Sequence, residues 1–176
     1  ASMPVAHVVP QLLSFHERLK MRTIYRLQKD SVYSCLGTGI AGIPGVMQGR
    51  LMTDARQAED LMKRGEFVVL LATEGTRDAI LNILFSYQNV GLITTYGSDS
   101  SHEADLTRAA GIPAVINVNA SVTDGEVVFD GGTIKPGEII GIDGGCSLVF
   151  KADKVIIEED HTVEEIAYGI QPLEQQ

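Results

Sequence analysis

The chain of 176 residues has no tryptophan, only two cysteines and no long apolar run. Two cysteines are too few for a disulfide framework or a zinc motif, so we expect Cys35 and Cys146 to be small buried residues in a reducing compartment. No apolar stretch approaches the roughly 20 residues that a membrane-spanning helix needs. Nothing has the make-up of a secretory signal, and we expect a cytoplasmic protein.

Basic residues are also scarce: 14 stand against 23 acidic ones, and the formal net charge is −9. No basic face is expected to dominate such a surface, so nucleic acid is not an expected partner. Frequent Val, Ile and Leu runs with mixed charges argue against disorder. The length suits one domain with a full hydrophobic core.

The apolar pattern predicts a helix near the N-terminus. Between Val8 and Leu27 apolar residues recur loosely at helical spacing, with Lys and Arg between them, and the helix is expected from about Pro10 to about Gln28. We assign residues 1–35 to this helical extension, 36–157 to the main domain, and 158–176 to a short helix with a polar tail. The N-terminal helix is either a peripheral connection or a docking site for a partner.

The middle of the chain alternates between buried strands and capped helices, which is typical of an α/β fold. Strands are predicted at 46–52, 67–71, 90–94 and 113–118, and the continuous apolar run at 67–71 is the pattern of a buried strand. Helices are expected after Thr53 or Asp54, after Thr76 and after Ser100, with Gly65 ending the first and Gly111 the third.

Two other segments are rich in glycine. Residues 37–49 lack the Gly-Lys-Ser/Thr of a phosphate-binding loop and lead into a strand pattern, so we interpret them as turns rather than a cofactor cradle. After residue 120, Gly- and Asp-rich turns separate short strands without helices, predicted at 126–129, 138–142, 147–150 and 154–157. The whole predicts a β layer, an α/β layer and covering helices.

The segment from Gly97 to Glu103 joins a buried strand to a helix, where α/β folds usually place chemistry. Ser100 and Glu103 have the spacing of a capping box, with Ser100 as the cap, which puts His102 in the first turn. Free N–H groups and the helix dipole there favour an anion and disfavour imidazolium. A neutral, nucleophilic histidine at such a site suits a phosphoryl acceptor, and a solvent-facing histidine without a task is the alternative.

A metal site is not expected in this segment. The possible ligands are Asp99, His102, Glu103 and Asp105. Neighbouring residues of one helical turn cannot all converge on one ion. Cys146 has no basic neighbour in the sequence, so a catalytic thiol is not expected either.

Four stretches, in order, resemble the phosphohistidine domain of phosphoenolpyruvate-utilising enzymes, also called the swivelling or mobile domain. This family includes pyruvate phosphate dikinase, phosphoenolpyruvate synthase and enzyme I of the sugar phosphotransferase system. Its hallmark Gly-Gly-x-Thr-Ser-His-Ala-Ala corresponds to residues 97–104, and is followed here by Arg108 and by Gly-Ile-Pro-Ala-Val at 111–115. The other matches are residues 39–49, 68–76 and 137–144, so the resemblance extends over about 36–151.

The resemblance implies a three-layer β/β/α swivelling domain and a phosphoprotein with His102 as the phosphoryl acceptor and donor. It places Gly97, Ser100 and Ser101 around the phosphate pocket, with Arg108 in support. It implies that the domain is one part of a phosphotransferase rather than a complete enzyme. Its partners would be nucleotide-binding and phosphoenolpyruvate/pyruvate-binding domains, in the same chain or separate. Those partners would hold Mg²⁺ with ATP or phosphoenolpyruvate, and no cofactor or metal would be bound by this domain.

Several residues depart from the family pattern. Ser98 replaces a glycine, Ala72 replaces a common arginine, and Glu103 and Asp105 replace apolar residues. Asp105 shares a helix face with His102, where it would either orient the imidazole or repel a bound phosphate. The departures leave open a divergent non-catalytic interaction or regulatory module on the same fold, or a general small-anion-binding domain.

Overall fold

The computed structural model describes residues 25–27, 32–154 and 157–159. Most of the expected N-terminal helix lies outside these residues. Its last turn was predicted wrongly, because Tyr25–Leu27 is strand β1 and pairs antiparallel with β13 (Ile157–Glu159). Pairing with a strand some 130 residues away along the chain overrides the local helical spacing here. The C-terminal helix and tail expected after residue 159 also lie outside the described residues.

Within the described residues, eight strands form the main sheet. Across the sheet they are β2 (Val32–Thr38), β12 (Leu148–Lys154), β11 (Ile139–Asp143), β4 (Val46–Met52), β5 (Val68–Ala72), β6 (Val90–Thr94), β7 (Ala114–Ile116) and β3 (Ala41–Ile43). The run from β4 to β7 is parallel, and the flanking strands are antiparallel. The first strand of the main sheet along the chain is β2, which begins at Val32.

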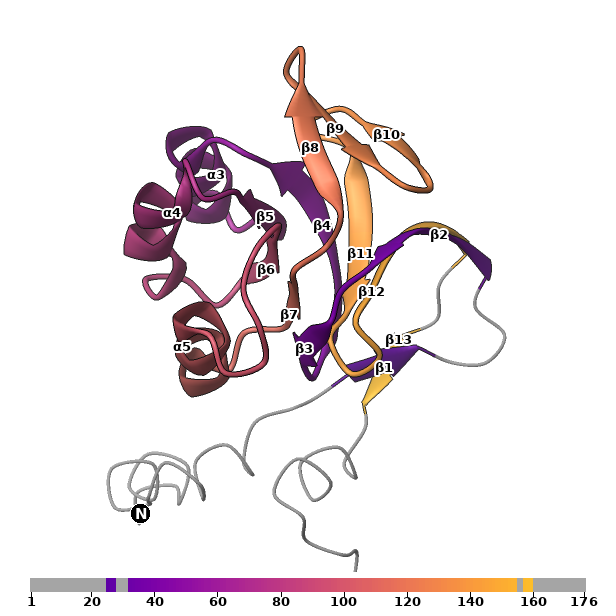
Figure 1. Cartoon of the computed structure of the whole chain (residues 1–176), viewed down its shortest axis with the longest axis horizontal. Coiled ribbons are helices and arrows are strands. Elements are labelled where there is room, and N and C mark those ends of the chain that lie inside the picture. The colour runs from indigo at the N-terminus through magenta and orange to yellow at the C-terminus, as the bar shows by residue number, and fades with distance from the viewer. Residues whose placement is uncertain (1–24, 28–31, 155–156, 160–176) are drawn as a thin grey trace, which may run out of the picture.

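Helices connect the parallel strands and cover one face of the sheet (Figure 1). They are α3 (Ala55–Lys63), α4 (Arg77–Leu84) and α5 (His102–Ala110). Of the two expected caps, Thr53 and Asp54, it is Asp54 that caps α3, since its carboxylate accepts from the Gln57 N–H at 3.0 Å. Gly111 ends α5 with a φ of +74°. Because each helix follows a parallel strand, α4 and α5 both begin at the carboxyl edge of the sheet.

The opposite face of the main sheet is covered by an antiparallel meander of β8 (Ala120–Thr123), β9 (Glu126–Phe129) and β10 (Gly132–Ile134). Figure 1 shows this small sheet on the other side of the main sheet from α3 and α4. The molecule therefore has the three layers β/β/α, which confirms the predicted fold class.

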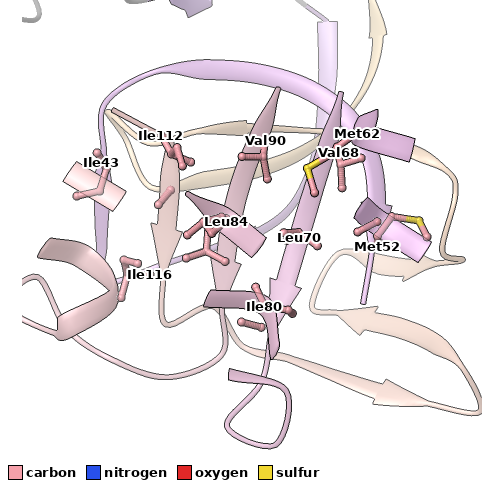
Figure 2. Close-up of a cluster of buried hydrophobic side chains, with 14 of the residues drawn as sticks. Ile43, Met52, Met62, Val68, Leu70, Ile80, Leu84, Val90, Ile112 and Ile116 are labelled. Carbon is pink, nitrogen blue, oxygen red and sulfur yellow. The ribbon is translucent and has the colours of Figure 1, made fainter. Parts of the chain in front are cut away.

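Strand β5 explains why the layers form. All five of its residues are buried, and alternate side chains point to opposite faces. Val68 and Leu70 pack with Ile80 and Leu84 of α4 in the cluster shown in Figure 2. Val69 and Leu71 belong to the second cluster, which β9 and β10 complete. A continuous apolar run is the pattern expected for a strand covered on both faces.

The glycine-rich segment 37–49 serves close packing between backbones. A Cβ on Gly42 would lie 2.0 Å from the carbonyl oxygen of Gly144, so no larger residue fits where these two loops meet. Part of the segment expected as turns is strand β3, which pairs with β7. Its glycines thus leave room for neighbouring parts of the chain.

Both cysteines are exposed, which corrects the expectation that they are buried. Cys35 lies on β2, at the outer edge of the main sheet, and Cys146 lies in the turn between β11 and β12. Edge strands and turns have fewer neighbours than the central strands, so small apolar character alone does not bury a side chain there. Among the described residues, no helix is long and apolar enough to cross a membrane.

Candidate functional site

His102 is the first residue of α5, and its side chain is exposed. Its expected position in the first turn of a helix after a buried strand is confirmed. Strand β6 ends at Thr94, and residues 95–101 lead the chain over the carboxyl edge of the sheet into the helix. The fold therefore presents the imidazole at the edge where parallel α/β sheets bind ligands.

The helix cap is Ser101, so the predicted capping box of Ser100 and Glu103 is wrong. The Ser101 hydroxyl accepts from the Ala104 N–H at 3.4 Å and donates to the Ser98 carbonyl at 2.7 Å. Glu103 cannot reach back as a box requires, because its side chain turns into the protein and is 3% exposed. Ser100 is exposed, with its hydroxyl 3.3 Å from that of Ser98.

Two backbone donors remain at this helix start. The Ala104 and Asp105 N–H groups bond to the hydroxyl and carbonyl of Ser101. The N–H groups of His102 and Glu103 have no hydrogen-bond acceptor within the described part of the chain. Unpaired N–H groups at a helix start, aided by the helix dipole, attract anions.

The loop before the helix is held by Gly97 and Asn117. Gly97 has a φ of +100°, which L side chains rarely adopt, and its carbonyl accepts from the Asn117 amide at 3.1 Å. The buried Thr94 hydroxyl accepts from the Asn117 N–H at 3.0 Å and donates to the Tyr96 carbonyl at 2.6 Å. These contacts tie the loop to the ends of β6 and β7.

Glu103 is buried and forms an ion pair with a partly exposed arginine. Its Oε1 lies 2.5 Å from Nε of Arg77, the first residue of α4, and 3.4 Å from the Tyr96 hydroxyl. The Arg77 guanidinium also lies over the Tyr96 ring, 5.7 Å from its centroid. Burial of the Tyr96 ring, together with the Glu103 charge, raises the pKa of the Tyr96 hydroxyl, which therefore stays protonated and can donate to the carboxylate.

Asp105 does not lie against His102 in the structure. Its Oδ1 pairs with Nη1 of Arg108 at 3.1 Å, on the exposed side of α5. Nη2 of Arg108 reaches the Asp99 carbonyl at 3.5 Å. Arg108 therefore links the end of α5 to the preceding loop, and among the described residues no hydrogen bond joins either residue to His102.

A pocket of about 460 Å³ lies between α4 and α5. Its lining residues are Arg77, Asp78, Leu81, Asn82, Phe85, His102 and Leu106. Of the predicted site residues, His102 lines this pocket, while Gly97, Ser100 and Ser101 form the loop and cap beside it. Arg108 and Asp105 lie along α5, away from the pocket lining.

Arg77 and Asn117 are the residues of this site that the sequence analysis missed. Asn117 follows the buried strand β7 and has a φ of +58°, an unusual conformation that a polar residue after an apolar run can signal. Arg77 is ordinary as a single letter, since basic residues are common on helix surfaces. Its importance comes from a partner 26 positions later, Glu103, which local patterns do not indicate.

In the described part of the chain, no three His, Cys, Asp or Glu side chains converge as metal ligands. Cys146, whose sulfur is partly buried and lies next to Asp143, has its pKa raised to about 11. It is therefore a thiol near neutral pH rather than a nucleophilic thiolate.

Comparison with known proteins gives this geometry a family context. Residues 64–146 match the family model described as "PEP-utilising enzyme, mobile domain". The match includes β5 to β11, the Ser101 cap and His102. It supports a mobile domain of a phosphoenolpyruvate-utilising enzyme over this part of the chain.

The chain is similar to pyruvate, phosphate dikinases. It is 25% identical over 128 residues to that of Rhizobium meliloti (strain 1021), covering 71% of this chain and 14% of the relative. For Rickettsia conorii (strain ATCC VR-613 / Malish 7) the identity is 26% over 136 residues, covering 76% and 15%. For Clostridium symbiosum it is 26% over 123 residues, covering 67% and 14%. The chain thus spans about one seventh of these relatives.

Proposed function

We propose that this chain is the phosphoryl-carrier domain of a phosphoenolpyruvate-utilising phosphotransferase, with His102 as the carrier. The observation that supports this most directly is the exposed imidazole at the first residue of α5, beside two unpaired backbone N–H groups. The helix start would hold the negatively charged phosphoryl oxygens while the imidazole holds the phosphorus. The match to the mobile-domain family over residues 64–146 supports the same proposal.

The chemistry requires a neutral imidazole. The lone pair of one ring nitrogen forms an N–P bond as the P–O bond to the donor's leaving group breaks, and the bonding electrons leave on that oxygen. The second ring nitrogen keeps its proton, so no general base is needed in this step. Transfer onward reverses these events: the N–P bond breaks, the electron pair returns to the ring, and an acceptor oxygen forms the new P–O bond.

The donor and acceptor would be held by partner domains. The chain covers 14–15% of the dikinases that it resembles, which leaves room in those proteins for other domains. We propose a nucleotide-binding and a phosphoenolpyruvate/pyruvate-binding domain as the two partners, in the same chain or separate. Mg²⁺ with ATP or phosphoenolpyruvate would be bound there.

The non-catalytic alternative is weakened by the ion pairs around His102. The non-catalytic alternative arose because two carboxylates, near the histidine in the sequence, replace apolar residues of the family pattern. Each of them is paired with an arginine: Glu103 with Arg77, and Asp105 with Arg108. The net charge of these four side chains is zero, so a phosphate on His102 need not face two uncompensated carboxylates.

The test is labelling with phosphoenolpyruvate, Mg²⁺ and the phosphoenolpyruvate-binding domain of a pyruvate, phosphate dikinase. A parallel reaction supplies ATP, Mg²⁺ and the nucleotide-binding domain. We expect an acid-labile phosphate on His102, seen by phosphorus NMR and by mass spectrometry of the intact chain. His16→Ala, which removes another histidine, should label like the wild type.

Label that persists in His102→Ala would disprove His102 as the carrier. Absence of label in both reactions, with a folded chain, would instead favour the non-catalytic module. His102→Ala removes an exposed side chain, so its unfolding transition should match that of the wild type and exclude misfolding as the cause of lost labelling.

A further inference from the structure

We infer that Arg77 is a phosphate-binding residue of the His102 site, and that Glu103 is the positioning residue that holds Arg77 there. The inference rests on the proposed function and deepens it, because it assigns the side-chain cation that receives the phosphoryl group. The ligand class is a tetrahedral phosphate, either free or bonded to His102. The inference is based mainly on the pocket between α4 and α5, which Arg77 and His102 both line.

The topology explains why these two residues meet. Arg77 is the first residue of α4, and His102 is the first residue of α5. The strands that precede these helices, β5 and β6, are parallel neighbours in the sheet. Two helix starts therefore lie at one edge, and each brings positive dipole character to the same pocket.

The guanidinium of Arg77 is fixed on one side and available on the other. Its Nε pairs with Oε1 of Glu103 at 2.5 Å, and its plane lies over the Tyr96 ring. Within the described residues, neither Nη1 nor Nη2 donates a hydrogen bond, and the shortest contact of the ion pair is made by Nε. The side chain of Arg77 is 42% exposed while that of Glu103 is 3% exposed, so the solvent-accessible part of this ion pair belongs to Arg77.

Burying a carboxylate costs desolvation free energy, and an apolar residue of similar size could fill the same space without that cost. As a positioning group it has a clear use. A guanidinium already held by Nε loses little side-chain freedom when it binds an anion through Nη1 and Nη2, and that fork suits two phosphate oxygens. Because Glu103 directly follows His102, the guanidinium is held against the residue next to the carrier.

The experiment uses two probes that need no partner domain. Inorganic phosphate is titrated while amide NMR signals of His102 and Glu103 are followed. Separately, phosphoramidate is supplied as a donor, which transfers its phosphoryl group to an imidazole nitrogen and releases ammonia. The variants are Arg77→Gln, Glu103→Gln, the double variant Arg77→Gln/Glu103→Gln, and Arg56→Gln as a control with the same change in net charge on the exposed surface of α3.

We expect Arg77→Gln to weaken phosphate binding and slow His102 phosphorylation by at least about tenfold, the loss of one charge-assisted hydrogen bond. The double variant should remain as impaired, because it removes the unpaired buried carboxylate but restores no cation. Arg56→Gln should stay within about twofold of the wild type, as expected for a distant surface charge.

Recovery of phosphate binding and phosphorylation in the double variant would overturn the inference, because Arg77 would then only neutralise Glu103. Wild-type affinity in Arg77→Gln, or no phosphate binding by the wild type, would overturn it as well. Failure of the proposed relay appears differently: phosphate and phosphoramidate would act on the wild type through Arg77, while neither partner domain would label His102.

Discussion

Nε of Arg77 lies 2.5 Å from Oε1 of Glu103, and this ion pair joins the first turn of α4 to the first turn of α5. The two partners differ in exposure: Glu103 is almost wholly buried, whereas Arg77 is partly in solvent. The two residues of the pair therefore contribute differently to the stability of the fold. Removing the arginine strands a buried charge, while removing the carboxylate charge leaves a cation that water can still solvate.

The first prediction follows from this asymmetry. Arg77→Gln should lower the free energy of unfolding by about 2 kcal/mol, and Glu103→Gln by less than about 1 kcal/mol. Urea unfolding followed by circular dichroism measures both values. Arg56→Gln, on the exposed face of α3, should lie within about 0.5 kcal/mol of the wild type. Equal losses in the two site variants would show that the burial of Glu103 is not the controlling feature.

The second prediction separates the two serines before α5. Ser101→Ala should cost about 1 kcal/mol of stability, because it leaves the Ala104 N–H without its cap and removes the bond to Ser98. Ser100→Ala is the matched control and should change stability little, since its exposed hydroxyl contacts only the Ser98 hydroxyl among the described residues. Comparing the thermal unfolding of the two variants shows which serine caps the helix. A larger loss of stability for Ser100→Ala than for Ser101→Ala would show that Ser100 caps the helix, as the sequence predicted.

The third prediction concerns pH and Glu138. The pKa of its carboxyl is lowered from 4.5, chiefly by the hydrogen bond from the Lys135 backbone N–H, which lies 2.6 Å from Oε2, with Lys151 assisting. A folded-state pKa below the unfolded one means that the contribution is complete above pH 4.5 and is lost as the pH falls through the folded value.

Glu138→Gln should therefore be less stable than the wild type at pH 7, by a few tenths to about 1 kcal/mol for such an exposed group. This difference should shrink as the pH falls below 4.5. Chemical unfolding of both proteins at a series of pH values measures it. A difference that grows on acidification would contradict the assigned cause.

The fourth prediction concerns the Cys146 thiol. Partial burial and the neighbouring Asp143 carboxylate raise its pKa to about 11, so little thiolate exists at neutral pH. In a Cys35→Ser background, alkylation by iodoacetamide should be slow at pH 8 and should rise with a midpoint near 11. Asp143→Asn should move the midpoint down. A midpoint at or below the ordinary value of 9.0 would refute the shift.

Much of the fold could be read from the sequence because its signals are local. The apolar run at 67–71 predicts a buried strand, and the observed β5 (Val68–Ala72) is shifted by one residue and buried throughout. The preceding helix α3 begins after Asp54, one of its two expected caps, and ends before Gly65. These features depend on side chains within a few positions of one another. The three layers follow, since parallel strands joined by helices leave one sheet face for the β-meander after residue 120.

The predictions from sequence were wrong where residues far apart in the chain determine the local structure. The residues Tyr25–Leu27 fit a helical spacing but form a strand because β13 supplies its hydrogen-bond partners. Neither serine of the Ser100–Ser101 pair is a better cap by its chemistry, and the loop tied down by Asn117 selects Ser101. Cys35 is exposed because its strand falls at the edge of the sheet, an order that pairing alone determines.

By itself, the sequence determined the β/β/α layers and placed His102 at the start of a helix after a buried strand, because periodicity and caps act over one or two turns. Only the tertiary structure decided that Glu103 is buried rather than capping, that Asp105 pairs with Arg108, and that Arg77 joins the pocket. Charges interact through space, over distances set by the placement of α4 and α5 after neighbouring parallel strands. In the folded protein, the two carboxylates that the sequence places near His102 are therefore each paired with an arginine.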